Sequence, residues 1–413
     1  QILYNHPMAE IRQIIHLDLD AFFCAVEEQR DPSLRTKPFA VGGSPTGRGV
    51  VASCSYPARA FGIHSAMPMA QAVRLCPDLI IVRSHFDAYR AKSKQVMTKL
   101  RLLTPLVEQI SIDEAFLDVT ALPEAAPDLA RRVQEAIRSD LGLPASLGVA
   151  SNKLVAKIAN NVGKARASAA QLQGGSPNAI LIVPPGSEAT FLAPLPCREL
   201  WGVGPKTAER LHELGVTTIG DIARFPQAEL ARLFGKHGAD LAQRARGIDT
   251  RPVVTEHERK SVSSETTFAR DISDGVELRR TIRRLSTSVA QRLGKAGLVG
   301  ATVKLKLRWD DFVTPTRQTT LAQPTADAAL IAEAALTLFD RLWVHGKPVR
   351  LLGVGVSGLD ERPYQPTFWE METTAFRQAE EKHRKHEQLR ALMRDLDERY
   401  GPGVMRRGSE LEE

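Results

Sequence analysis

Residues 110–120 read ISIDEAFLDVT, an apolar stretch rich in β-branched residues with two adjacent carboxylates, Asp113 and Glu114, near its start. The residues on either side of this pair, 107–112 and 115–119, alternate as residues in β-strands do. Neighbouring side chains on a regular strand point to opposite faces, so both acids can serve one site only if the chain bends there, as at a bulge or hairpin tip. The alternative is a turn with two solvated carboxylates, because Asp and Glu are mostly exposed in proteins.

A second stretch, residues 14–23, reads IIHLDLDAFF and favours a metal site. Its alternate residues fall on two faces, an apolar one with Ile15, Leu17 and Leu19 and a polar one with His16, Asp18 and Asp20. This pattern predicts a half-buried strand that carries acids at its C-terminal end. Two strands that each carry an acid can together hold Mg²⁺, which takes one or two carboxylates and completes its shell with water and substrate phosphate. Two such ions about 3.5–4 Å apart clamp the attacking and leaving oxygens of a phosphoryl transfer.

Three motifs carry a resemblance to a known family. They are DLDAFF at residues 18–23, SYPARAFG at residues 55–62 and SIDEA at residues 111–115. In order and spacing they closely resemble the Y-family (translesion) DNA polymerases, nearest to the DNA polymerase IV or DinB branch, and the resemblance covers nearly the whole chain. It implies an α+β multidomain fold, a right-hand polymerase with a ferredoxin-like palm, small fingers, a helical thumb with a helix-hairpin-helix motif, and an α/β little finger.

The resemblance also implies how the chain is divided. The expected parts are a palm (1–29 and 88–185), fingers (30–87), a thumb (186–248), a linker (249–258), a little finger (259–360) and a C-terminal tail (361–413). Within the palm, the local pattern predicts a helix over 152–161 with Ser151 as its N-cap, followed by a loop over 163–177.

Length and composition are compatible with this division. The 413 residues are too many for one core and suggest about two to four domains. The net charge of +7 favours a polyanionic partner. No apolar run of about 18 residues could span a membrane, and residues 1–10 lack the pattern of a signal peptide. Four scattered cysteines without CxxC spacing argue against a zinc site or a disulfide scaffold and fit a reducing cytoplasm.

The resemblance makes Asp18, Asp113 and Glu114 the catalytic metal ligands, with the carbonyl of Leu19 as a further oxygen donor. Two Mg²⁺ ions per active site are implied. They would lower the pKa of the primer 3′-hydroxyl and neutralise the triphosphate as pyrophosphate leaves. Asp20 either contributes beside this site or is a structural carboxylate, and the sequence leaves both interpretations open.

Tyr56, Arg59 and Lys164 resemble a triphosphate clamp, in which a guanidinium grips phosphate oxygens bidentately and a phenol donates one hydrogen bond. The family normally has proline after this lysine, whereas Ala165 stands here and a longer loop, to about residue 179, is expected to follow. Either the loop is a surface insertion that leaves Lys164 in place, or the lysine has drifted from the clamp.

Phe23 is the candidate steric gate, because a bulky ring under the sugar would clash with a 2′-hydroxyl. The alternative, an ordinary core phenylalanine, suits Phe22 better, although Phe22 is also expected beside the nucleotide. Small residues at the expected roof over the base pair, Ala52 and Ser53, would leave the site open. An open site excludes distorted templates poorly, which is how the family bypasses lesions and copies with low fidelity.

Two regions are candidates for DNA binding. Residues 200–211, LWGVGPKTAERL, resemble a helix-hairpin-helix in which Gly202 and Gly204 form the turn, Pro205 starts a helix, and Lys206 and free amides meet a phosphate. Between residues 259 and 360, 16 lysines and arginines stand against 10 acids, an excess of six. A strand over 301–309 places Lys304, Lys306 and Arg308 on one face, where phosphate contact is expected rather than simple solvation. The alternative for the hairpin is that it only packs.

The tail has two parts. Residues 375–400 predict a charged helix, and the earlier part contains Gln365, Phe368 and Trp369. This trio loosely resembles the glutamine-led motif by which family members dock on a sliding clamp, although Pro366 stands where a small aliphatic residue is usual. Aromatic anchors dominate peptide docking. The alternative is that both aromatic rings pack on the enzyme's own surface.

The function implied is template-directed addition of deoxynucleotides to a primer 3′-hydroxyl, with low fidelity and lesion bypass. No second carboxylate cluster for a 3′–5′ exonuclease stands out, so no proofreading is expected. The expected partners are primer–template DNA, damaged DNA included, deoxynucleoside triphosphates and a sliding clamp, with a monomer as the active form. A nucleotidyl cyclase on a similar palm would need neither the hairpin nor the basic domain, and a non-catalytic relative would have lost the carboxylates.

Overall fold

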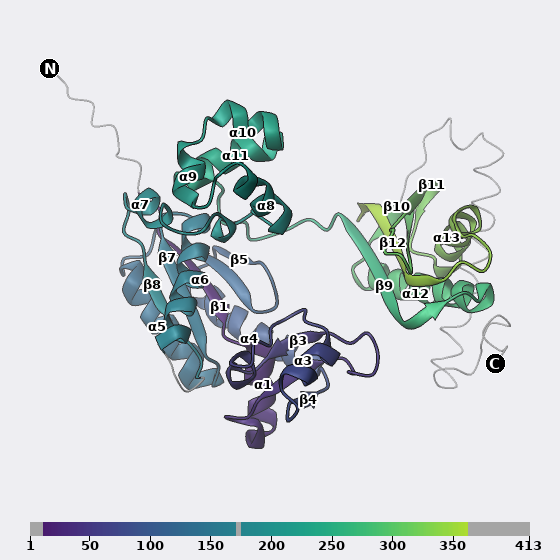
Figure 1. Cartoon of the computed structure of the whole chain (residues 1–413), viewed down its shortest axis with the longest axis horizontal. Helices are drawn as coiled ribbons and strands as arrows, with labels where there is room; N and C mark the ends of the chain where they lie inside the picture. Colours follow the sequence, from purple (N-terminus) through teal and green to yellow (C-terminus); the bar gives the residue numbers. More distant parts are fainter. Residues whose placement is uncertain (1–10, 171–174, 362–413) are drawn as a thin grey trace. The chain divides into compact units, whose positions relative to one another are not determined.

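The computed structural model of the chain describes residues 11–170 and 175–361. Contacts divide the chain into two compact units, with the boundary between His257 and Glu258 (Figure 1). Among the described residues, no helix has the length and apolar character needed to cross a membrane.

The first unit is built around a five-stranded sheet in the order β5-β6-β1-β7-β8. All neighbours are antiparallel except β7 and β8, which are parallel. The strands are β1 (Ile14–Leu19), β5 (Val107–Gln109), β6 (Glu114–Asp118), β7 (Ala145–Ala150) and β8 (Ile180–Ile182). The two sequence stretches with the candidate carboxylates therefore lie side by side, because β1 pairs directly with β6.

Helices cover both faces of this sheet (Figure 1). On one face, Ile15, Leu17 and Leu19 pack in a core with α1 (Phe22–Arg30), α4 (Phe86–Leu103) and α5 (Ala126–Leu141). On the other face, Ile14 packs with α6 (Lys153–Ala170). The expectation of a half-buried β1 is wrong: even His16, on the polar face, is 0% exposed, because α6 lies over that face.

Helix α6 is longer than the sequence pattern predicts. It continues to Ala170, through most of the stretch interpreted as a loop, because residues 164–170 are good helix formers that outweigh Gly163. The N-cap prediction is also wrong: the side chain of Asn152 accepts the bond from the Val155 amide (3.0 Å), while Ser151 donates to Glu188. Gly148 lets α6 approach β7 closely, since a Cβ there would lie 2.0 Å from the Ala156 carbonyl oxygen.

Residues 31–85 add a small three-stranded sheet in the order β3-β2-β4. Its elements are 3-10 helix η1 (Pro32–Leu34), β2 (Phe39–Gly42), β3 (Val51–Cys54), α2 (Tyr56–Arg59), α3 (Met69–Leu75) and β4 (Ile80–Val82). They enclose a separate apolar core that includes Ala40, Ile63 and Met69. This part presents α2, which carries the expected triphosphate contacts.

Residues 186–246 are helical, as the sequence predicts. The elements are α7 (Glu188–Leu192), 3-10 helix η2 (Cys197–Glu199), α8 (Pro205–Glu213), α9 (Ile219–Arg224), α10 (Gln227–Phe234) and α11 (Lys236–Ala245). As expected, Pro205 is the first residue of α8, and Gly204 is its N-cap. Gly202 adopts φ +105°, a conformation that favours glycine, so the tight turn before α8 is confirmed.

Much of the predicted linker is attached to the first unit rather than free. The Asp249 carboxylate accepts the Leu154 amide of α6 at 3.1 Å. Glu108 of β5 accepts both the Val254 amide (2.8 Å) and the buried Lys153 ammonium (2.7 Å). The sequence could not show these bonds, because the bonded residues lie 45 to 146 positions apart.

The second unit is a four-stranded antiparallel sheet in the order β11-β10-β12-β9, with two helices. Its elements are β9 (Ser261–Ile272), α12 (Gly275–Lys295), β10 (Val299–Trp309), β11 (Thr316–Thr325), α13 (Ala328–Leu342) and β12 (Val349–Asp360). The helices pack on the buried side of β10, formed by Val303, Leu305 and Leu307. The predicted alternation of β10 is confirmed, and its basic side chains lie on the opposite face.

Candidate active site

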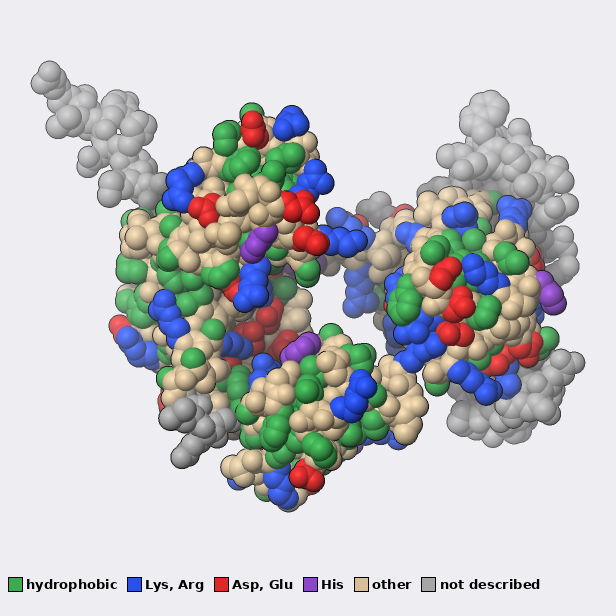
Figure 2. Space-filling view, in the orientation of Figure 1, with side chains coloured by type: hydrophobic (Ala, Val, Ile, Leu, Met, Phe, Trp, Pro, Cys, Tyr) green, Lys and Arg blue, Asp and Glu red, His purple; other side chains and the backbone are tan. Residues whose placement is uncertain are grey.

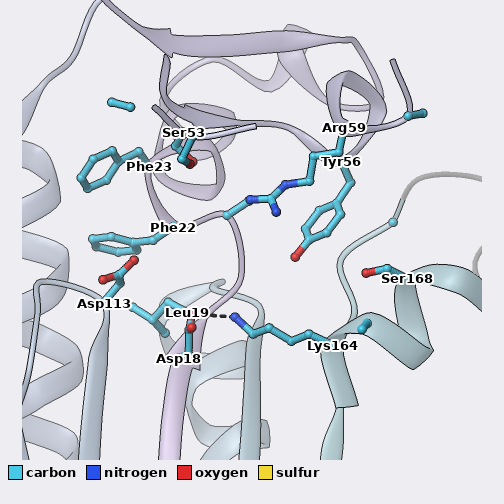
Figure 3. A pocket seen from close by; sticks show the side chains of 16 residues that line it. Asp18, Leu19, Phe22, Phe23, Ser53, Tyr56, Arg59, Asp113, Lys164 and Ser168 are labelled. Atoms are coloured by element: carbon cyan, nitrogen blue, oxygen red, sulfur yellow. Dashed lines mark ion pairs between the residues drawn. The ribbon is translucent and has the colours of Figure 1, made fainter. Parts of the chain in front are cut away.

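A cavity of about 650 Å³ lies in the first unit, where β1, β3, α2 and α6 meet (Figure 3). Nine of the residues expected in the active site line it: Asp18, Leu19, Phe22, Phe23, Ser53, Tyr56, Arg59, Asp113 and Lys164. They come from four separate segments of the chain. The structure therefore brings together the three motifs that the sequence shows far apart.

The bend expected at Asp113 and Glu114 is present, just before β6 begins. The hydroxyl of Ser111 accepts the amides of Asp113 (3.2 Å) and Glu114 (3.0 Å) and donates to an Asp113 oxygen at 2.5 Å. Across the sheet, Glu114 is the register partner of Asp18, and the Leu19 amide donates to the Asp113 carbonyl at 3.0 Å. Ser111 thus fixes a turn that brings both acids next to the end of β1.

Asp18 is the carboxylate at the floor of the cavity. Its side chain is 17% exposed and lies 2.6 Å from the Lys164 ammonium (Figure 3). Burial raises the pKa of Asp18 to about 7, although the charge of Lys164 acts to lower it. Burial also disfavours the charged form of Lys164, but Asp18 and Asp20 outweigh this effect and raise its pKa. The ionised form of Asp18 therefore depends on a nearby cation, because burial alone favours the protonated form.

Glu114 lies beside the cavity rather than in its lining. Its carboxylate accepts the ammonium of Lys157 from α6 at 2.8 Å, and Lys157 also lies over the Trp201 ring. The described residues contain no group of three or more acids, histidines or cysteines that is arranged to hold a metal ion. Two of the three candidate carboxylates instead pair with lysines, Asp18 with Lys164 and Glu114 with Lys157.

Asp20 is completely buried, and its side chain is absent from the cavity lining. Both of its oxygens accept the Ser146 hydroxyl at 2.9 Å, and one accepts the Asn178 amide at 3.0 Å. The Lys164 ammonium lies 3.0 Å from it. Of the two interpretations left open, these contacts favour a supporting carboxylate over one that faces substrate.

Phe22 and Phe23 differ in their surroundings, as expected. Phe22 is 2% exposed and belongs to the core, whereas Phe23 is only partly buried. The Phe23 ring stacks on Tyr89 of α4, with centroids 4.3 Å apart and planes 12° from parallel. The Tyr89 hydroxyl donates to buried Glu27 at 2.5 Å. Phe23 is thus held from behind while its ring borders the cavity (Figure 3).

Tyr56 and Arg59 reach the cavity from α2, a four-residue helix capped by Ser55. The Arg59 guanidinium lies 5.0 Å from the Tyr56 ring centroid and donates to the Cys54 carbonyl at 3.4 Å. Burial raises the pKa of Tyr56, so its hydroxyl stays a hydrogen-bond donor. Tyr56 points into the cavity from the side opposite Lys164 (Figure 3).

The extended α6 explains what the sequence interpretation missed. Because the helix continues, Lys164, Ala165 and Ser168 follow each other along its cavity side, and all three line the cavity. Lys164 has not drifted, since it contacts Asp18 despite the missing proline. Ser65 also lines the cavity. If residues 161–170 had been interpreted as a helix, Ser168 would have been predicted on the same side as Lys164. No pattern in the sequence around Ser65 indicates that it lines the cavity.

The candidate DNA contacts are at the surface. Gly202, Gly204 and Lys206 are exposed at the start of α8. On β10, Lys304 is exposed, Lys306 pairs with Glu265 at 2.9 Å, and Arg308 donates to Thr314 at 2.8 Å. Figure 2 shows several basic side chains on the side of the second unit where β9 and β12 lie. The predicted helix over 375–400 and the residues Gln365, Phe368 and Trp369 lie outside the described residues.

Comparisons with known proteins agree with the motifs. The impB/mucB/samB family model matches residues 17–161, its C-terminal domain model matches residues 259–368, and the IMS family HHH motif matches residues 185–216. DNA polymerase IV of Streptomyces coelicolor is 46% identical, over 86% of this chain and 72% of that protein. DNA polymerase IV of Halorhodospira halophila is 44% identical, over 85% of this chain and 96% of that protein. The chain belongs to the DNA polymerase IV branch of the Y-family.

A solved Y-family structure supports the same conclusion. A Y-family DNA polymerase chimera of Dbh and Dpo4 is 26% identical to this chain, with a TM-score of 0.74 over 85% of this chain and all of that one. The predicted fold class, an α+β multidomain right-hand polymerase with a helix-hairpin-helix, is confirmed for this Y-family member.

Proposed function

We propose that the chain is a template-directed DNA polymerase of the translesion type, which adds deoxynucleotides to a primer 3′-hydroxyl. The observation that carries this proposal is a single cavity that joins the Asp18 and Asp113 carboxylates to Tyr56, Arg59 and Lys164. Nucleotidyl transfer requires carboxylates that bind the metal ions at the attacking hydroxyl and hydrogen-bond donors that bind the triphosphate. The sequence of relatives named DNA polymerase IV adds independent support.

The donor set fits magnesium. Asp18 and Glu114 are opposite each other on paired strands, and Asp113 lies in the turn that adjoins them, so three side chains with hard carboxylate oxygens lie near one end of the sheet. Each of the first two is already held by a lysine, which shows that the position favours positive charge. Asp18, Asp113, Glu114 and the Leu19 carbonyl would hold two Mg²⁺ ions per site. When bound there, magnesium would lower the pKa of the primer 3′-hydroxyl and neutralise charge on the phosphates.

The chain's own residues then bind and orient the nucleotide. Arg59 and Tyr56 donate to the triphosphate from α2, while Lys164 donates from α6 on the opposite side of the cavity. Phe23 lies where a sugar 2′-hydroxyl would clash and so selects deoxynucleotides. Ala52 and Ser53 are small, so the cavity tolerates distorted base pairs, which accounts for lesion bypass and low fidelity.

The wider architecture has matching roles. We assign residues 1–29 and 88–185 to the palm, 30–87 to the fingers, 186–248 to the thumb, 249–258 to the linker and 259–360 to the little finger. The α8 turn and the basic face of β10 contact the phosphates of primer–template DNA, damaged DNA included, without sequence preference. The enzyme acts as a monomer in the cytoplasm, which suits four free, buried cysteines.

A sliding clamp is the proposed protein partner. Gln365 would lead the docking motif in the tail, with Phe368 and Trp369 as its anchors. Changing both aromatic residues to Ala should leave extension by the enzyme alone unaltered and abolish its stimulation by a loaded clamp. Stimulation that survives the change would place the clamp contact elsewhere.

The experiment that tests the function is primer extension on a primed template, with Mg²⁺ and with chelator. A template-complementary ladder that requires Mg²⁺ is expected. Conversion of free nucleoside triphosphate to a cyclic product without DNA would favour a nucleotidyl cyclase. Binding of DNA without either product would favour a non-catalytic role.

A further inference from the structure

Asp20 is a buried charge that the proposed chemistry does not use. It follows Asp18 by two residues at the end of β1, and it is 0% exposed. An ionised carboxylate is costly to bury unless it is paired and hydrogen-bonded. Asp20 meets this requirement with the Ser146 hydroxyl, the Asn178 amide and one cation, Lys164.

The cation is shared between two acids of different character. The Lys164 ammonium lies 2.6 Å from Asp18 and 3.0 Å from Asp20. The Asp18 side chain is 17% exposed and lines the cavity, whereas Asp20 is enclosed behind it. Any cation that binds at the Asp18 oxygens competes with Lys164 for them, but the buried Asp20 stays available to the lysine.

We propose that Asp20 is a positioning residue that anchors Lys164 for the nucleotide triphosphate. This inference rests on the proposed polymerase function. An ammonium has three N–H donors. An N–H group that donates to Asp20 would hold the Lys164 nitrogen at the cavity wall. The other two N–H groups would then be available to phosphate oxygens when a metal ion takes the place of Lys164 at Asp18. Without the anchor, the flexible four-carbon side chain must be ordered by the nucleotide itself, which weakens binding.

The competing explanation is that Asp20 only stabilises the fold. It ties β1 to Ser146 on β7 and to the segment before β8, where the Ala179 amide also donates to the Ser146 hydroxyl at 3.0 Å. Two variants separate these roles. Asp20→Asn removes the charge that holds Lys164, and Ser146→Ala removes the hydroxyl bonds to Asp20 while leaving that charge in place.

The test measures binding of the complementary deoxynucleotide to enzyme on a primer–template, in Mg²⁺, with a dideoxy-terminated primer so that no chemistry occurs. Melting temperature and DNA affinity are measured for each variant. Asp20→Asn should weaken nucleotide binding on the order of tenfold, the loss of one charge-assisted contact, with DNA affinity unchanged. Ser146→Ala should lower the melting temperature without a comparable loss of nucleotide affinity.

A double-mutant cycle with Lys164→Met makes the test specific. In the Lys164→Met background, Asp20→Asn should cause no further weakening, because the group that Asp20 positions is gone. Nucleotide affinity equal to wild type in Asp20→Asn, or equal weakening in both backgrounds, would overturn the inference. If the wild-type complex itself binds no complementary nucleotide, the proposed function fails and the inference falls with it.

Discussion

At the scale of single residues, surroundings rather than residue type set the roles in this site. Asp18 lies in β1 and Asp20 directly follows that strand, yet Asp18 borders the cavity and Asp20 is buried behind it. Phe22 and Phe23 are adjacent and both line the cavity, yet Phe22 is 2% exposed and belongs to the core, whereas Phe23 is only partly buried. In each pair the more exposed residue, Asp18 or Phe23, is the one for which we propose direct contact with metal or substrate.

Phe23 gives the sharpest test at this scale. Phe23→Ala should admit ribonucleotides while deoxynucleotide incorporation changes much less, because the ring acts by steric clash with a 2′-hydroxyl. The quantity to measure is the ratio of kcat/KM for the two sugars, which should shift towards ribonucleotides by roughly tenfold or more. An unchanged ratio would mean that Phe23 is a packing residue stacked on Tyr89 and that the gate lies elsewhere.

The sequence allowed most of the cavity lining to be predicted, because the motifs carry their own spacing. It did not reveal which acids would be exposed, since the burial of Asp20 depends on β7 and on the segment before β8. Nor did it reveal the lysines that neutralise Asp18 and Glu114. Those contacts join residues 43 or more positions apart, and they exist only because α6 lies across the sheet.

At the scale of elements, α6 organises the site. It carries Lys157 and Lys164, and it covers β1 because Gly148 allows it to approach β7. The sequence predicted where this helix begins but not its length, since the pattern of residues 163–177, which start with Gly163, indicates a loop. Helix propensity and burial against the sheet outweighed those local signals.

Gly148→Ala tests how α6 packs. The new Cβ would lie 2.0 Å from a backbone oxygen of α6, so the variant should lower the free energy of unfolding by about 1–3 kcal/mol or more. The matched control is Gly294→Ala in α12, where a Cβ meets nothing within 4 Å. That change should raise stability by about 0.5–1 kcal/mol. Equal effects in chemical denaturation would contradict the close packing.

Strand β10 is the element proposed to grip DNA. Changing Lys304, Lys306 and Arg308 to Gln should weaken binding to all sequences alike and lower the log–log salt slope by about 0.9 per lost phosphate contact. Lys306 should contribute least, because Glu265 already holds it.

The control for this triple variant removes the same charge from another surface. Arg283, Arg284 and Lys295 are exposed on α12, which packs on the opposite face of the sheet. Changing these three to Gln should leave the salt slope near the wild-type value. Equal slopes for the two triple variants would show that net charge, rather than the β10 face, governs binding.

At the scale of the whole molecule, basic residues are concentrated between residues 259 and 360. The excess of six basic residues between 259 and 360 is nearly the whole chain's net charge of +7. The first unit holds the candidate carboxylates, two of which pair with lysines, and Figure 2 shows acidic side chains in a hollow of that unit. We propose that one unit performs phosphoryl transfer and that the other adds affinity for the DNA backbone.

The central claim is that carboxylates at the end of β1 and before β6 perform nucleotidyl transfer. The most direct measurement is the single-turnover rate of primer extension by Asp18→Asn in Mg²⁺, with DNA affinity measured in parallel. Loss of charge stabilisation in the transition state should reduce the rate by a factor of about 100 or more, with DNA affinity largely unchanged. A wild-type extension rate in Asp18→Asn would contradict the account.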